Sequence, residues 1–175
     1  MKTQTTSTTV NWYALRSKSR AEKKVAERLA ERGMDVYLPL VTTLKVWSDR
    51  KKKVQTPLIP SFVFIKTDPV SLFENLNVSG VSGVLRFLGK PAIIRNQEIE
   101  NLKILINGGE NVTVEENLSI KKGEEVEVIR GPFAGLLAQA IAIKGKYRLL
   151  VNVTSLGATF SVNVPISFVK KRLSA

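Results

Sequence analysis

The chain has 175 residues, of which 43% are hydrophobic and 24% are charged, as in a folded globular protein with one domain or two small ones. It contains no cysteine and no histidine, which excludes disulfides and removes the commonest metal ligands, nucleophiles and general bases. The formal net charge of +12 favours nucleic acid or another anionic surface as the partner.

Residues 1–9 are rich in threonine and have no apolar core, so we expect a flexible leader and not a signal peptide. No apolar stretch is long enough to span a bilayer, so no membrane partner is expected. The absence of cysteine makes a reducing cytoplasm the simplest location. We expect no enzymatic activity, no metal and no cofactor.

The first predicted strand is Asn11–Ser17. Ser19 and Glu22 follow with the spacing of a capping box, which predicts the start of a helix that ends near Gly33. One face of this helix is apolar and the other is mostly cationic. The next expected elements are a strand over Val36–Leu40 and a hairpin arm, Thr42–Trp47 and Lys53–Thr56, with the basic tip Ser48–Lys52.

The run Phe62–Thr67 is apolar, aromatic and β-branched, as in a strand buried on both faces in the middle of a sheet. Asp68 and Pro69 then predict the N-cap and first turn of a short helix ending near Asn77. A strand over Val84–Leu88 and a helix from Asn96 to about Ile106 complete the order β-α-β-hairpin-β-α-β-α. This order predicts an α+β sandwich with an antiparallel sheet.

Residues 107–117 are polar and contain glycine, which indicates a linker. Beyond it, four β-rich segments are separated by Gly131-Pro132, Gly145 and Gly157, and they predict a small β-barrel. Because glycine and proline interrupt this part repeatedly, we expect no stable all-helical form. The four segments are Glu124–Ile129, Leu136–Ile143, Tyr147–Val153 and Thr159–Val164.

Two groups of residues carry a resemblance to a known family. Residues 120–136 (IKKGEEVEVIRGPFAGL) resemble a KOW motif, with a strand, Gly-Pro-Phe-Ala-Gly and a second strand. Residues 58–64 (LIPSFVF) resemble a Phe-Pro-Gly-Tyr-Val-Phe pattern, with Ser61 where that pattern has glycine. Together with Trp12-Tyr13, GVSGVLRF (80–87) and PAII (91–94), these segments make the chain similar to the NusG family of transcription elongation factors.

The resemblance implies an NGN α/β sandwich over residues 10–106, a linker over 107–117 and an SH3-like KOW β-barrel over 118–175. It implies a monomer that binds the clamp helices of RNA polymerase and promotes processive elongation or antitermination. Residues 86–94 and the high net charge are similar to the specialised RfaH and UpxY types. That similarity implies a specific operon set, such as capsular polysaccharide genes.

The site residues implied by the resemblance form three groups. The apolar polymerase-binding patch would contain Trp12, Ile59, Phe62, Phe64 and Val84. Non-template DNA or nascent RNA would meet Lys18, Arg20, Lys24, Arg28 and Arg32 on the first helix and Arg50, Lys51, Lys52 and Lys53 on the arm. A ribosomal protein or Rho would meet Arg130, Phe133, Ser155 and Leu156 on the KOW domain.

Each group also has a purely structural interpretation: core packing for the aromatics, a solvated helix face for the cations and a barrel plug for Phe133. Two rival functions stay open at this point. One is an RNA-binding or ribosome-associated KOW protein that does not act on polymerase. The other is an enzyme that acts on nucleic acid through carboxylates, for which Glu115-Glu116 and Glu124-Glu125-Glu127 are the densest acidic sets.

Overall fold

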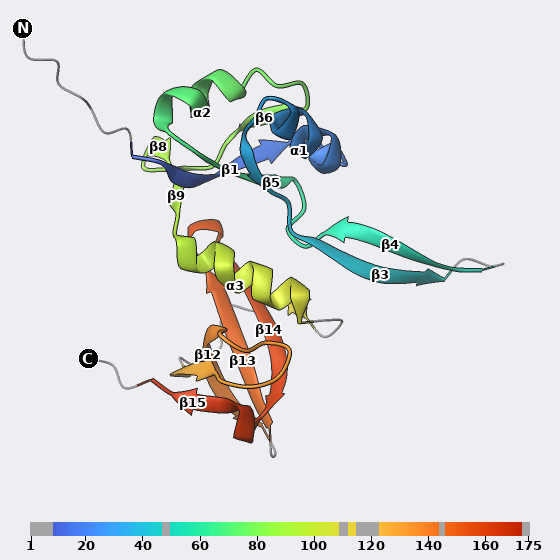
Figure 1. Cartoon of the computed structure of the whole chain (residues 1–175), viewed down its shortest axis with the longest axis vertical. Helices are drawn as coiled ribbons and strands as arrows, with labels where there is room; N and C mark the ends of the chain where they lie inside the picture. Colours follow the sequence, from blue (N-terminus) through green and yellow to red (C-terminus); the bar gives the residue numbers. More distant parts are fainter. Residues whose placement is uncertain (1–8, 47–49, 109–111, 115–122, 144–145, 173–175) are drawn as a thin grey trace, which may run out of the picture. The chain divides into compact units, whose positions relative to one another are not determined.

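The computed structural model describes residues 9–46, 50–108, 112–114, 123–143 and 146–172, which form two compact units. The first unit contains residues up to 40 together with 56–95, and the second contains 41–55 together with 96–175. Helices accompany mostly antiparallel sheets in the described residues, which confirms the predicted α+β class (Figure 1). Residues 1–8 of the predicted leader lie outside the described residues.

The first unit is built on a five-stranded sheet in the order β2-β5-β1-β6, with β9 also paired to β1. The predicted central strand is confirmed with its bounds, because β5 lies between β1 and β2 and its residues Val63, Phe64 and Ile65 are fully buried. The strands are β1 (Asn11–Ser17), β2 (Asp35–Tyr37), β5 (Phe62–Thr67), β6 (Val81–Val84) and β9 (Ile93–Ile94).

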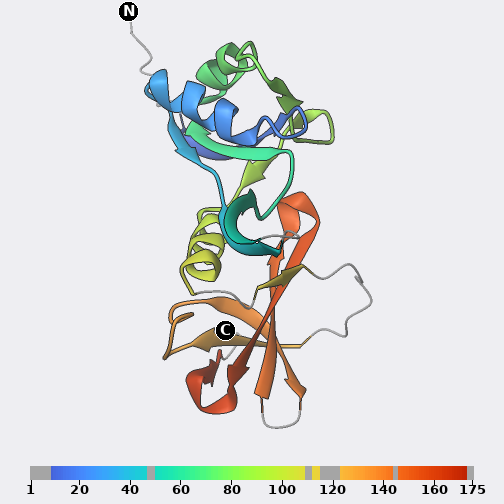
Figure 2. The same cartoon turned by 90° about the vertical axis from the view of Figure 1, so that its right-hand side faces the viewer.

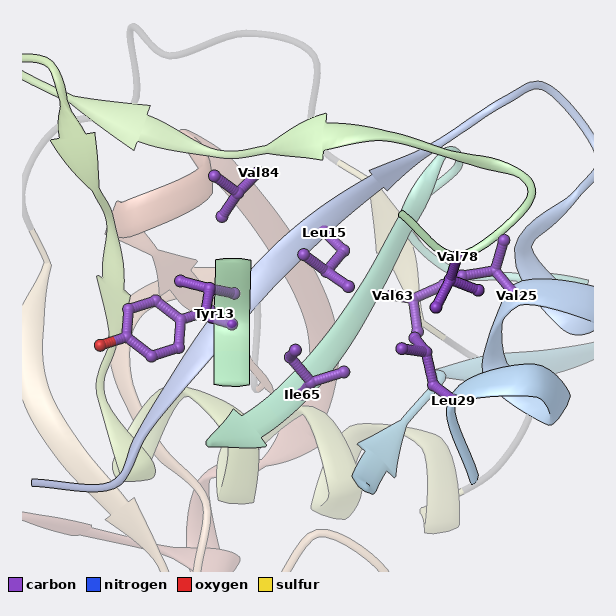
Figure 3. Close-up of a cluster of buried hydrophobic side chains, with 9 residues drawn as sticks. Tyr13, Leu15, Val25, Leu29, Val63, Ile65, Val78 and Val84 are labelled. Carbon is purple, nitrogen blue, oxygen red and sulfur yellow. The ribbon is translucent and has the colours of Figure 1, made fainter. Parts of the chain in front are cut away.

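Helices α1 (Glu22–Glu31) and α2 (Pro69–Asn75) pack on one face of this sheet. Val25 and Leu29 of α1 meet alternate residues of β1 and β5, among them Leu15 and Val63, in a shared apolar core (Figure 3). Burial of these aliphatic side chains contributes roughly 1.5–3 kcal/mol each to stability. The core therefore assigns every second residue of β1 and β5 to the helix-covered face.

The capping-box prediction for α1 is wrong. Its N-cap residue is Ala21, and no side chain caps the helix. The Glu22 carboxylate is committed elsewhere, because its Oε1 accepts a hydrogen bond from the Ser61 backbone N–H at 2.8 Å. The cap of α2 is as predicted, with Pro69 in the first turn and Asp68 Oδ1 accepting from the backbone N–H groups of Val70 and Ser71.

Two predicted strands are divided differently in the structure. The segment Val36–Leu40 breaks at Pro39, so β2 ends at Tyr37 and β3 (Leu40–Val46) starts the arm. The segment Val84–Leu88 breaks after Val84, and β7 (Arg86–Phe87) pairs with β8 (Lys90–Pro91) as a separate small hairpin. The arm is confirmed as a hairpin of β3 with β4 (Lys51–Pro57), but β4 begins inside the predicted tip, so Lys51 and Lys52 belong to the strand; residues 47–49 lie outside the described residues.

The second unit is a six-stranded sheet in the order β10-β14-β13-β12-β11-β15, packed against α3 (Asn96–Asn107) (Figure 2). Strand β10 lies inside the predicted linker and pairs with β14. The domain boundaries at 106 and 118 stay a prediction. The strands are β10 (Thr113–Val114), β11 (Glu124–Val128), β12 (Leu137–Ile143), β13 (Lys146–Val153), β14 (Ala158–Pro165) and β15 (Val169–Lys171), with 3-10 turns η1 (Thr154–Leu156) and η2 (Ile166–Phe168).

The N-cap of α2 makes stability depend on pH in a defined direction. A hydrogen bond from the Ser71 hydroxyl to Asp68, with those from backbone N–H groups, lowers the Asp68 pKa below its usual value of 3.8. A lowered pKa stabilises the fold above 3.8, and this contribution is lost as the pH falls through the folded-state pKa. We expect the difference in Tm between wild type and Asp68→Asn, which caps without titrating, to change over this acidic range. A difference that is independent of pH would contradict this assignment.

Candidate functional site

The two faces of the central sheet separate the predicted patch residues. Since Tyr13, Leu15, Val63 and Ile65 point into the helix-covered core, Trp12, Phe62 and Phe64 lie on the opposite face. Trp12 and Phe64 are buried, whereas Phe62 is half-buried. Three of the five predicted patch residues therefore share one face, and on it Phe62 is the most accessible of the three.

The other two predicted patch residues, Val84 and Ile59, do not lie on the sheet face that carries Trp12, Phe62 and Phe64. Val84 is a member of the helix-side core with Leu15 and Val63, so its side chain lies on the other face of the sheet. Ile59 lies in the turn between β4 and β5 and is only 8% exposed. A charge introduced at Ile59 would enter the interior and destabilise the unit.

Arg16 is a residue of this face that the sequence analysis missed. It lies directly opposite Phe62 in the β1–β5 pairing, and its guanidinium carbon is 5.7 Å from the centre of the Phe62 ring. Arg16 is exposed, so the pair presents a cation stacked on an aromatic ring. The alternation of β1 places Arg16 on this face, but only the register of the two strands reveals its partner.

The predicted cations of the first helix are all exposed, but they do not form one continuous site. Arg28 is bound to the backbone, since its Nη1 donates to the Ser79 carbonyl oxygen at 2.6 Å. Arg32 follows the last residue of α1, and Lys18 precedes the helix with its backbone N–H on the Gly80 carbonyl. Arg28 thus holds the loop before β6, and this role was not foreseen.

Arg20 and Lys24 line an open hollow of about 510 Å³ at the start of α1, here called the α1 hollow. Lys23 adds a third cation to it, and Thr56, Pro57, Pro60 and Ser61 form the other wall. The α1 N-terminus, with the positive end of the helix dipole, lies at the same place, and the Glu22 carboxylate that also lines the hollow is bound to the Ser61 N–H. The α1 hollow is therefore a cationic part of the first unit.

Ser61, a residue of the wall of the α1 hollow, has a strained backbone conformation. Its φ of 62° lies in the left-handed region that disfavours side chains. The Glu22 carboxylate binds its N–H, and its carbonyl accepts from the Ser17 N–H at 2.9 Å. These bonds tie the start of β5 to α1 and β1. The left-handed φ of Ser61 also explains why glycine suits this position in the related pattern.

The arm carries its predicted cations mainly on a strand. Lys51, Lys52 and Lys53 open β4 and are exposed, and Arg50 precedes them. Because side chains alternate along a strand, Lys52 points to the opposite side from Lys51 and Lys53. The arm therefore presents positive charge on both of its faces.

Two of the four predicted partner residues of the second unit are engaged by other residues of that unit: Ser155 by α3, and Phe133 by the residue that follows α3. The Glu98 carboxylate of α3 accepts hydrogen bonds from the Ser155 hydroxyl at 3.0 Å and from its N–H at 3.4 Å. Phe133 is buried, and its ring lies so close to Gly108 that any side chain at position 108 would collide with it. Arg130 is exposed and Leu156 is half-buried.

Asn101 attaches α3 to the sheet through its side-chain amide. Its Nδ2 donates to the Leu137 carbonyl at 3.0 Å, and its Oδ1 accepts from the Leu137 N–H at 3.4 Å. The amide thus pairs with the backbone of β12 as a neighbouring strand would. Because Asn101 and Glu98 are both buried, these polar contacts fix the position of α3 on the second unit.

Within the described residues, no group of three or more acidic side chains is arranged to hold a metal ion. None of the helices described there is long and apolar enough to cross a membrane.

A family profile described as "Transcription termination factor nusG" matches residues 10–103. The chain is 29% identical over 173 residues to the "Transcription termination/antitermination protein NusG" of Rickettsia prowazekii, covering 91% of this chain and 89% of the relative. It is 28% identical over 176 residues to the protein of the same name from Helicobacter pylori J99, covering 93% and 98%. A solved structure described as "Domain interaction in Thermotoga maritima NusG" shares the fold at 22% identity with a TM-score of 0.50, covering 93% of this chain and 97% of that one.

Replacing Ser61 with glycine should stabilise the first unit. Glycine removes the left-handed strain, and after the larger entropy loss of glycine on folding the net gain is about 0.5–1 kcal/mol. Urea unfolding measures the change. Ser61→Ala is the matched control, because it removes the hydroxyl but keeps the strain and should bring no gain. Equal stability of the two variants would show that Ser61 is not strained.

Replacing Asn101 with alanine should destabilise the second unit by about 1–3 kcal/mol, because its two part-buried hydrogen bonds to the Leu137 backbone are lost, each contributing about 0.5–1.5 kcal/mol net. Asn107→Ala, an exposed position at the end of the same helix, should change stability by less than about 0.5 kcal/mol. Thermal unfolding of the full chain compares the two. Equal effects would mean that the Asn101 amide does not attach α3.

Proposed function

Because the chain belongs to the NusG family, we propose that it is a transcription factor that binds RNA polymerase and promotes processive elongation or antitermination. Its relatives are named transcription termination/antitermination proteins, which supports this reading. In this proposal the chain works as a cytoplasmic monomer without catalysis or cofactor. The genes it serves would be a restricted operon set, such as those for capsular polysaccharide, as in the RfaH and UpxY types.

The observation that carries the proposal is the Phe62–Arg16 pair. We propose that the polymerase clamp helices bind the sheet face that carries Trp12, Phe62 and Phe64. Phenylalanine and arginine are both enriched at protein interfaces, and this pair presents a half-buried ring beside an exposed guanidinium. Trp12 and Phe64 are buried farther along the same face and would support the sheet there. Val84 supports the same sheet from its core side.

The cations would contact the nucleic acid that accompanies the polymerase. In this proposal the non-template strand or nascent RNA follows Lys18 and the α1 hollow, and the arm cations Arg50 to Lys53 reach a second stretch of backbone. Phosphate contacts of this type make affinity fall with salt. Arg28 would contribute less, since its guanidinium already binds the Ser79 carbonyl.

The second unit would recruit a further protein such as a ribosomal protein or Rho. Arg130 is the exposed member of the predicted set and would be met first. Contact through Phe133 or Ser155 requires a change in their present contacts with Gly108 and Glu98.

Co-purification with core RNA polymerase tests the proposal. Phe62→Ala and Arg16→Ala should each weaken retention, with a loss of roughly thirtyfold in affinity if Phe62 contributes about 2 kcal/mol. Phe73→Ala is the matched control, because Phe73 is an exposed phenylalanine of α2 in the same unit. Circular dichroism confirms that each variant is folded.

Two results would contradict the proposal. If wild type is not retained even at low salt, polymerase is not the partner, and RNA binding by the second unit becomes the leading function. If wild type, Phe62→Ala and Arg16→Ala are retained equally, polymerase binding stands but does not use this face.

A further inference from the structure

The hairpin formed by β7 and β8 presents two apolar side chains to solvent. Phe87 is 71% exposed and Leu88 is 87% exposed, although both are large hydrophobic residues. The Phe87–Lys90 pair closes the hairpin, and Leu88 and Gly89 form its two-residue loop. We call residues 86–90 the β7–β8 tip. Exposure of this degree shows that neither side chain contributes to the core.

The conformation of Leu88 is unfavourable as well as exposed. Its φ is 49° and that of Gly89 is 80°, so both loop residues are in the left-handed region. Two-residue hairpin loops of this kind strongly prefer asparagine, aspartate or glycine at the first position. Leucine is disfavoured there and gains no burial in return. The fold therefore gives no reason for a leucine at position 88.

The charge around the tip has one sign. Arg86 and Lys90 are exposed on either side of Phe87 and Leu88, and no acidic residue occurs between Asp68 and Glu98 except Glu74. Phe87 and Lys90 are directly opposed in the pairing, so their side chains lie on the same face of the hairpin. The tip thus offers one aromatic ring next to a cation, with a second cation on the other face.

We propose that the β7–β8 tip binds single-stranded nucleic acid, with a base stacked on Phe87. Lys90 contacts the adjacent phosphate, Leu88 covers the edge of the stacked base, and Arg86 contacts the backbone on the other face. Aromatic stacking platforms beside cations bind single strands with little sequence preference. A tip of two apolar residues is too small for a stable apolar protein interface, and its unbalanced cations suit phosphate better than a protein surface.

This site goes beyond the proposed function, whose cations lie on α1 and on the arm. It also requires no polymerase, so it is tested with the purified full chain alone. Polymerase retention can therefore fail while oligonucleotide binding succeeds, and variants at Phe87 distinguish binding by the tip from binding by the cations of α1 and the arm.

Fluorescence anisotropy with labelled dT and rU oligonucleotides of about 12 nucleotides measures the affinity. Phe87→Ala should raise Kd roughly tenfold, whereas the matched control Phe73→Ala should leave it unchanged. Lys90→Ala should reduce the dependence of Kd on salt concentration. Phe87→Trp should retain binding and show quenched emission on adding the oligonucleotide. The dT and rU arms distinguish DNA from RNA as the source of the strand.

Leu88→Gly separates binding from folding. Glycine relieves the left-handed conformation, so the variant should have an unchanged or higher Tm, yet its Kd should rise several-fold. A purely structural Leu88 would give no loss of binding.

The proposal is overturned if the full chain does not bind the oligonucleotides, or if Phe87→Ala and Phe73→Ala bind them equally well. It is also overturned if Phe87→Ala loses retention on polymerase while its oligonucleotide affinity is unchanged, which would identify the tip as a protein contact.

Discussion

The antiparallel pairing of β1 with β5 is the constraint on which the first unit depends. The register that places Leu15 opposite Val63 sends alternate side chains to opposite faces. The odd-numbered residues from 13 to 15 and from 63 to 65 face α1 and α2, and the even-numbered ones face away. A shift of one residue would exchange the two sets and destroy the core. The register therefore fixes which side chains lie on the second face, where Phe62 and Arg16 are accessible and Trp12 and Phe64 are buried.

The strained turn at Ser61 joins this sheet to the other features of the unit. Its N–H is bound by a buried carboxylate of α1 and its carbonyl by the end of β1, so three elements meet at one residue. Strain of this kind persists where surrounding contacts determine the conformation, and it often occurs near functional surfaces. Here the strained residue borders the α1 hollow and precedes Phe62, so the α1 hollow and the face that carries Phe62 start from the same turn.

The sequence predicted the elements whose cause is local, and it missed those that depend on distant residues. Phe62–Thr67 and the Asp68 cap were found because burial pattern and capping chemistry lie within a few residues. The capping box at Ser19 failed because Glu22 binds Ser61, 39 residues away. Arg16 was missed for the same reason, since its relation to Phe62 depends on register. The separation of Val84 from Trp12 and Phe64 likewise required the sheet order.

Helix α3 also depends on distant residues that its sequence pattern does not reveal, and these contacts affect how a partner could bind the second unit. Its periodicity identifies an apolar face but does not say what that face covers. Glu98 and Asn101, polar residues within this helix, make the deciding contacts with Ser155 and Leu137. Each hydrogen bond of the Asn101 amide contributes about 0.5–1.5 kcal/mol net and each bond to the Glu98 carboxylate about 1.5–3 kcal/mol, because water replaces these bonds when they break. A partner that needs Ser155 must offset the loss of its bonds to Glu98, and one that needs Phe133 must offset the loss of its burial, whereas one that needs Arg130 meets an exposed side chain.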